Sequence, residues 1–130
     1  MKFIRQRRAN DCGIACVAML GGVSYIRARE VAPYYPKNGL YTKDLVKMLR
    51  KLTKKPAKYN NKRYRTLKCY KSKKLKILRI VKDDKEMGHF IVTDGKRFYD
   101  PAEKQPILIS RAKRLAKWNS WKSAEEVVFT

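Results

Sequence analysis

The sequence predicts an α+β fold, with helices in the first half of the chain and a mostly antiparallel sheet in the second half. In the first half, apolar residues either fill a run between capping residues and glycines or recur at helical spacing. In the second half they alternate in short runs, two of which flank an Asp-Gly pair that is typical of a β-hairpin. The chain has 130 residues, the length of one domain, so we expect a single domain over residues 1–130.

The first expected helix covers residues 12–20, a run rich in Ala, Val, Met and Leu. Asn10 and Asp11 precede it and offer side-chain oxygens that can cap a helix, and Gly21 and Gly22 end it. Because the run is apolar on every side, we expect a central, buried helix. A strand is the alternative, since periodicity does not assign a short apolar run.

Two further helices are expected before residue 54. Ser24 is placed to cap a helix that runs through Val31 and ends at the prolines that follow. Thr42 is placed to cap a helix over residues 43–52, in which leucine and valine side chains share one face and lysine and arginine side chains the other. This amphipathic pattern predicts that the third helix covers the core with its apolar face.

The second half is expected to supply the sheet, after a loop over residues 54–61. Strands are expected at residues 64–70, 75–81, 88–93, 96–99 and 126–129, and a helix capped by Ser110 at residues 110–118. The turn at Asp94 and Gly95 joins two of these strands into the hairpin. We expect the last strand to lie at an edge of the sheet.

The charge of the chain is strongly positive. Its 33 lysines and arginines outnumber 11 acidic residues, for a net charge of +22 and a pI near 10.2. Residues 45–82 hold 16 of the basic residues and no acidic one. Such an excess indicates a polyanionic partner such as nucleic acid, and the candidate contacts are Lys68, Lys71, Lys73 and Lys74. The alternative is a solvated surface that only keeps the protein soluble.

The three cysteines and one histidine lack the spacing of a zinc site, since there is no Cys-x-x-Cys pair, and three is an odd and small number for a disulfide framework. We therefore expect no metal and no cofactor. No apolar run approaches the roughly 18 residues of a membrane span. The basic N-terminus is not followed by the apolar stretch of a signal peptide. We therefore expect a protein with reduced cysteines that stays in the cytoplasm or is carried in a virus particle.

Cys12, His89 and Asp100 form a candidate catalytic set. Cys12 would begin the first helix, where the helix dipole and free N–H groups favour a thiolate, the form of cysteine that attacks. His89 is the only imidazole that could serve it as a base. With a two-residue turn at Asp94 and Gly95, His89 would lie directly opposite Asp100, on the same face of the hairpin. Asp94 is the less favoured carboxylate because it belongs to the turn.

Three motifs resemble those of the C39 family of papain-like cysteine peptidases, the bacteriocin-processing peptidase domains. They are Gln6-x5-Cys12 within Gln6-Arg7-Arg8-Ala9-Asn10-Asp11-Cys12-Gly13-Ile14-Ala15-Cys16, then Gly88-His89-Phe90-Ile91-Val92, and finally Asp100-Pro101. The resemblance implies a papain-like fold over residues 3–129, with Cys12 as nucleophile and His89 as general base and then acid. It also implies that Asp100 orients His89, and that Gln6 donates to the oxyanion together with the backbone N–H of Cys12.

These observations predict a cysteine peptidase that acts on a peptide or protein. Two alternatives stay open: a basic papain-like protein of a phage or virus particle that binds nucleic acid with or without catalysis, and a deamidase or other thiol-dependent acyl transferase.

The remaining cysteines and the two tryptophans are not assigned to the catalytic site. Cys16, Trp118 and Trp121 are expected in or beside the core, and Cys69 is expected to be incidental.

Overall fold

The computed structural model of the chain describes residues 1–34, 39–67, 70, 72–82, 88–115, 118 and 120–129, without the side chains of residues 63 and 64. Its elements are, in chain order, α1 (Cys12–Gly21), α2 (Tyr25–Glu30), α3 (Thr42–Thr53), β1 (Ala57–Thr66), β2 (Lys76–Lys82), β3 (Gly88–Thr93), β4 (Arg97–Tyr99), β5 (Ile107–Leu108), α4 (Ile109–Ala112) and β6 (Trp121–Phe129). Helices come first and strands mostly follow, so the predicted α+β class is confirmed.

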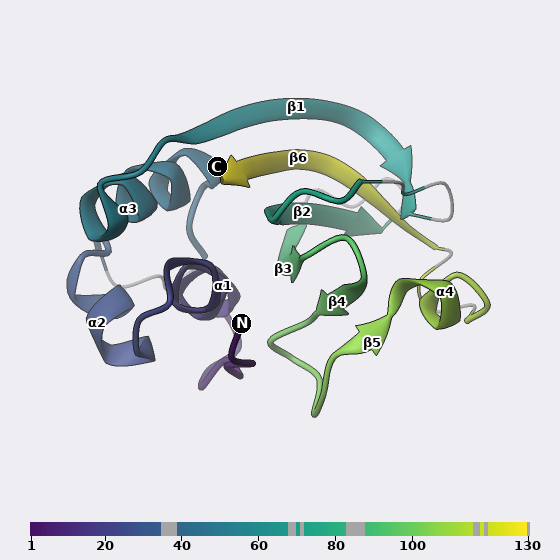
Figure 1. The fold of residues 1–130 in the computed structure, drawn as a ribbon, viewed down its shortest axis with the longest axis horizontal. Coiled ribbons are helices and arrows are strands. Elements are labelled where there is room, and N and C mark those ends of the chain that lie inside the picture. The colour runs from purple at the N-terminus through teal and green to yellow at the C-terminus, as the bar shows by residue number, and fades with distance from the viewer. Residues whose placement is uncertain are drawn as a thin grey trace.

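A six-stranded sheet forms the centre of the described fold, in the order β1-β6-β2-β3-β4-β5. The pairings among these strands are all antiparallel. Figure 1 shows α1, α2 and α3 gathered on one side of the molecule, with β1 and β6 arching side by side and α4 beside β5 at the other end. The C-terminal strand therefore returns to the middle of the sheet, between β1 and β2.

Apolar side chains cover both faces of the sheet. On the face toward α1 and α3, Ile77, Val92 and Val127 pack with the helices in one buried cluster. On the opposite face, Leu78 and Ile91 pack in a second cluster with side chains from β4 and α4. Successive residues of β2 and β3 thus enter different cores, because side chains alternate between the faces of a strand.

The structure confirms α1 and corrects its predicted cap. The run from residue 12 to residue 20 is buried throughout, and the helix ends with Gly22 in the left-handed conformation, at φ 67°. Asp11 stands at the N-cap position, yet its carboxylate makes no hydrogen bond to the first turn. It accepts hydrogen bonds from the preceding segment instead, so the prediction that Asp11 caps α1 with its side chain is wrong.

The second and third helices also form, with ends one residue from those predicted. Ser24 caps α2 as predicted, by accepting a hydrogen bond from the backbone N–H of Arg27. α3 begins at Thr42 rather than after it, so Thr42 does not cap the helix. Its hydroxyl instead donates to Glu125 of β6 at 2.7 Å, which ties the start of α3 to the sheet.

Two predictions about the outer strands are wrong. Residues 57–61, expected in a loop, belong to β1, which ends at Thr66 rather than at Tyr70. These residues carry little apolar alternation, and their pairing with β6 is what holds them extended. β6 in turn has nine residues and lies inside the sheet, so the short edge strand predicted over residues 126–129 is also wrong.

Of the remaining elements, β2, β3 and β4 confirm the predicted strands to within one residue, whereas the last helix differs. α4 has four residues, and Ser110 lies inside it rather than capping it. The short strand β5 pairs with β4 just before α4, and the backbone N–H of Ile109 donates to the carbonyl of Lys96. These bonds hold the chain against β4 up to residue 109, so the helix starts at Ile109, one residue before Ser110.

The hairpin between β3 and β4 is wider than predicted. Val92 pairs with Tyr99 and Thr93 with Phe98, so four residues, numbered 94–97, follow the last pair instead of two. Gly95 lies in this loop with φ 89°. A Cβ at this position would lie 2.6 Å from backbone atoms of the facing segment at residues 72 and 73. The loop therefore requires glycine for its conformation and for its close approach to that segment.

We expect Gly95→Ala to lower the free energy of unfolding by more than the same change at Gly22. Both glycines have positive φ, where alanine costs about 1–3 kcal/mol, but a Cβ on Gly22 would meet nothing within 4 Å. The difference between the two losses, measured by urea denaturation, isolates the clash at Gly95. Equal losses would contradict the close packing of this loop.

Candidate active site

Cys12 is placed by the start of α1. It is the first residue of the helix, where backbone N–H groups have no partner within the helix, and 8% of its surface is exposed. Gly13 follows, and a Cβ there would lie 3.1 Å from a side-chain carbon of Leu45 and 3.3 Å from one of Phe90. The absence of a side chain at residue 13 thus lets this end of α1 approach β3, in which His89 directly precedes Phe90.

His89 and Asp100 lie together, by a different register from the one predicted. Continued by one residue, the observed ladder puts Asp100 opposite Ile91, not opposite His89 as expected. The shift is by two residues, which keeps the side chains of residues 89 and 100 on the same face of the hairpin. The ring nitrogen Nε2 of His89 lies 2.6 Å from Oδ1 of Asp100, and the two side chains are 20% and 8% exposed.

Both neighbours of His89 favour its charged form. Burial alone lowers the pKa of His89, but hydrogen bonds to Asp100 and Cys12 and the negative charges of both groups outweigh it and raise the pKa to about 9. The structure therefore brings Cys12, His89 and Asp100 into one interacting group. At neutral pH, the ring of His89 is therefore favoured in its charged, doubly protonated form.

Gln6 lies near the group, but its amide points elsewhere in this structure. The backbone N–H of Gln6 donates to the carbonyl of Pro101, the residue after Asp100. The side-chain Nε2 donates to the carbonyls of Arg8 and Ala9, at 2.8 Å and 3.3 Å, while Oε1 is buried without a partner among the described residues. Gln6 is therefore held beside Asp100 without presenting its amide hydrogens to Cys12.

Asp11 anchors the segment that carries Gln6, a role that the sequence analysis missed. Its buried carboxylate accepts the backbone N–H groups of Arg7 and Arg8, each at 3.0 Å, and the hydroxyl of Tyr25. The guanidinium of Arg7 lies 4.3 Å from the centre of the Tyr25 ring. The only signal in the sequence is an aspartate directly before the cysteine, and capping explained it equally well.

The other candidates of the site region take structural positions. Asp94 accepts the backbone N–H groups of Lys96 and Arg97, both at 2.9 Å, as a turn residue does. Cys16 is fully buried in the helix-side core, and burial, followed by the charges of Cys12 and Asp100, raises the pKa of its thiol. Neither Asp94 nor Cys16 therefore competes with Asp100 or Cys12.

The two tryptophans take different positions, and one of them lies beside the group. Trp118 is buried and stacks on Phe98 at 5.1 Å between ring centres, which confirms the packing role predicted for it. Trp121, also assigned to packing, packs against the second cluster but also lies beside the imidazole of His89, with 6.4 Å between ring centres. A signal for this contact was absent from the sequence because 32 positions separate the two residues.

The structure describes two of the four basic residues proposed as nucleic-acid contacts. Lys73 and Lys74 are exposed, and Lys68 and Lys71 lie outside the described residues, as does Cys69. Across the part of the chain that the structure describes, histidine, cysteine and acidic side chains form no cluster that could hold a metal ion. Nor is any of the described helices long and apolar enough to cross a membrane.

The model of the peptidase C39 family matches residues 1–122 of the chain. The chain belongs to the peptidase C39 family. The fold is similar to the crystal structure of the peptidase domain of Streptococcus mutans ComA, with a TM-score of 0.63 and 19% identity over 100% of this chain and 99% of that chain. A comparison with curated protein sequences gives no match. The family makes the protein a cysteine peptidase.

In this C39 peptidase, we expect Asp11→Asn to loosen the segment that carries Gln6. An asparagine keeps one acceptor oxygen but turns an N–H donor toward backbone N–H groups, and hydrogen bonds to charged acceptors contribute about 1.5–3 kcal/mol each. Hydrogen exchange at Arg7 and Arg8 should become faster, and the unfolding free energy should fall.

Asp44→Asn is the matched control, because Asp44 also accepts a backbone N–H, that of Tyr41 at 2.9 Å. It should speed exchange at Tyr41 and leave Arg7 and Arg8 unchanged. Unaltered exchange at residues 7 and 8 in Asp11→Asn would show that the carboxylate does not hold this segment.

Proposed function

We propose that the protein hydrolyses peptide bonds with Cys12 as the nucleophile, His89 as the proton carrier and Asp100 as the group that orients His89. The observation that carries this proposal is the joint contact of Cys12 and Asp100 with one imidazole, with 2.6 Å between Nε2 of His89 and Oδ1 of Asp100. A thiol, an imidazole and a carboxylate in this order are the parts of a cysteine nucleophile with its base.

The geometry supports a thiolate mechanism. In this mechanism His89 accepts the proton of Cys12 and becomes an imidazolium, which the carboxylate of Asp100 stabilises. The thiolate attacks the peptide carbonyl, and the imidazolium then gives its proton to the leaving amine, which yields a thioester of Cys12. Water, deprotonated by the now neutral His89, hydrolyses the thioester and restores the thiol–imidazole pair.

The negative oxygen of each tetrahedral intermediate needs donors. The backbone N–H of Cys12 is one, because the first turn of α1 leaves it without a helical acceptor. We propose Gln6 as the second donor. Its Nε2 would turn from the longer of its two hydrogen bonds, 3.3 Å to Ala9, when a substrate enters. Catalytic hydrogen bonds of this kind often tighten only in the complex.

A hollow beside Asp100 suits a peptide substrate. It has a volume of about 680 Å³ and is lined by apolar side chains, including Leu108 and Trp118, and by charges of both signs, including Glu103 and Arg111. Such a mixed lining can take an apolar side chain and pair with a charged one. We propose that residues next to the cleaved bond lie here.

The nucleophile is tested by alkylation of the unaltered protein and by the activity of variants that each lack one cysteine. We expect iodoacetamide to modify Cys12 first and to leave Cys16 unmodified in the folded protein, because Cys16 is fully buried and burial raises its pKa. Mass spectrometry locates the modified residue. Cys12→Ala should abolish cleavage of a peptide library without loss of fold, whereas Cys16→Ala, the control, should keep activity at lower stability.

The same mass readout separates peptide cleavage from the alternative amide chemistry. Products shorter than the substrate, absent in Cys12→Ala, support the peptidase. Deamidated side chains without backbone cleavage would show that the same thiol catalyses deamidation and not peptide-bond hydrolysis. Turnover that persists in Cys12→Ala would overturn the catalytic assignment.

The pH dependence tests His89 and Asp100. Since the raised pKa of His89 is about 9, kcat/KM should fall as pH rises through about 9, when the imidazolium loses its proton. The same shift contributes stability that is complete below pH 6.5, the unfolded pKa, and is lost as pH rises through about 9. Asp100→Asn should move the alkaline limb to lower pH and reduce kcat/KM by about 10²-fold.

Asp94→Asn is the control, because it removes a carboxylate from the same hairpin without touching His89. Its alkaline limb should match that of the unaltered protein. If Asp94→Asn shifts the limb and Asp100→Asn does not, the wrong aspartate has been assigned.

A further inference from the structure

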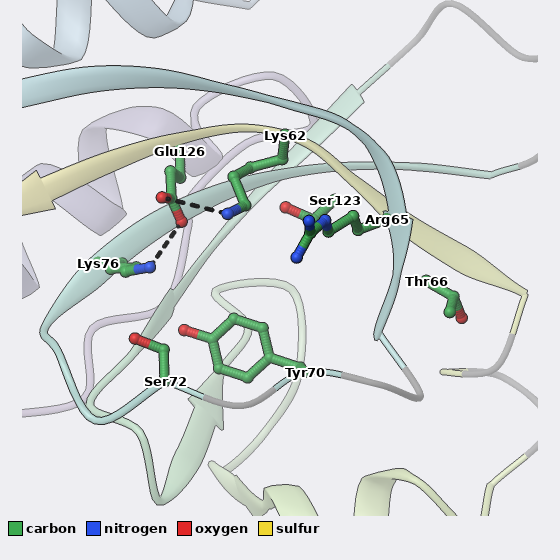
Figure 2. A pocket seen from close by; sticks show the side chains of 8 residues that line it. All are labelled: Lys62, Arg65, Thr66, Tyr70, Ser72, Lys76, Ser123 and Glu126. Carbon is green, nitrogen blue, oxygen red and sulfur yellow. Dashed lines mark ion pairs between the residues drawn. The ribbon is translucent and has the colours of Figure 1, made fainter.

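A second cavity lies apart from the proposed catalytic residues, between β1, β6 and the beginning of β2. Its volume is about 570 Å³. Figure 2 shows Lys62 and Lys76 reaching Glu126, with Arg65 and Ser123 to their right and Tyr70 below, next to Ser72. None of these residues belongs to the peptide-cleaving group described above.

Positive charge exceeds negative charge in this cavity. Lys76 pairs with Glu126 at 2.9 Å, Lys62 approaches the same carboxylate at 3.7 Å, and the side chains of Lys76 and Glu126 are 10% and 3% exposed. Arg65, at the exposed mouth, pairs with no carboxylate among the described residues. The cavity thus contains three cations and one carboxylate, and that carboxylate is paired with the two lysines.

One hydroxyl group in the cavity lacks a partner. The hydroxyl oxygen of Ser123 is buried and makes no hydrogen bond within the described part of the chain, whereas the buried hydroxyl of Tyr70 lies beside the side chains of Ser72 and Thr93. Ser123 as a whole is 3% exposed. A buried polar group without a partner costs free energy, so a ligand that accepts from it is favoured.

We propose that this cavity binds a terminal phosphate group. Arg65, Tyr70 and Ser123 would donate to its oxygens, and Lys62 and Lys76 would supply charge. A phosphate monoester carries about −1.5 to −2 charges at pH 7 and several acceptor oxygens, which match the excess of two cations and these donors. The volume leaves space for the group that carries the phosphate, whether a small molecule or the end of a nucleic acid chain.

The experiment is calorimetric titration of the full chain with inorganic phosphate at about 0.15 M salt, which screens contacts with exposed charges. We expect saturable binding that Arg65→Gln weakens about tenfold or more, because an arginine–phosphate pair is a strong charged hydrogen bond. Ser123→Ala and Tyr70→Phe should each weaken it severalfold without changing the net charge. Lys47→Gln, on the exposed face of α3, removes the same charge as Arg65→Gln and should have no effect.

Two oligonucleotides of one sequence, with and without a 5′-phosphate, identify the source of the phosphate. Preference for the phosphorylated end, lost in Arg65→Gln, supports the nucleic acid end, and binding of inorganic phosphate alone supports a small phosphate ester. The proposal is overturned if phosphate does not saturate at millimolar concentration. It is also overturned if Arg65→Gln and Lys47→Gln weaken binding equally, because binding would then follow net charge alone.

Discussion

Burial of α1 on all sides is the constraint on which the rest of the structure depends. Every residue from Cys12 to Leu20 is buried, so the helix has to be enclosed by the sheet on one side and by α2 and α3 on the other. Gly13 permits the close contact with β3 that this enclosure needs. As a result, Cys12 at the start of α1 lies close to His89 near the start of β3, which brings the thiol to the imidazole.

Acidic residues are scarce in this chain, and the described ones hold specific contacts. Glu125 and Glu126 are neighbours in β6 and face opposite sides of the sheet. Glu125 accepts from Thr42 and Tyr59 and pairs with Arg79, so it joins α3 and β1 to the middle of the sheet. Glu126 pairs with two lysines on the other face. With 11 acidic residues against 33 basic ones, the chain carries an excess of positive charge that anionic ligands would neutralise.

Two carboxylates near Cys12 position different parts of the proposed active site. Asp100 contacts the imidazole of His89 directly. Asp11 does not reach the imidazole but holds the backbone of the segment that contains Gln6, whose own N–H is bound to Pro101. The segment that carries Gln6 is thereby held at two places, by Asp11, which precedes Cys12, and by Pro101, which follows Asp100. Catalysis requires that each group is held within about 0.5 Å of its productive position, and these hydrogen bonds restrict the movement of the segment.

The sequence by itself determined the first three helices, the strand that carries His89 and the identity of the four proposed catalytic residues. These features depend on local patterns: an apolar run between polar and glycine residues, alternation along β3, and short motifs around Cys12, His89 and Asp100. The same-face relation of His89 and Asp100 also survived an error in the turn, because a register shift of two preserves the face.

Only the tertiary structure decided which strands are neighbours and where polar side chains point. β6 lies inside the sheet and residues 57–61 become a strand because each supplies the other's hydrogen bonds, although 66 positions separate partners such as Asn60 and Glu126. The carboxylate of Asp11 turns from α1 to the preceding segment for a similar reason, since Tyr25 completes its set of donors. Pairings between distant segments leave no periodic signal in the sequence, so their geometry is settled by the packing of the whole chain.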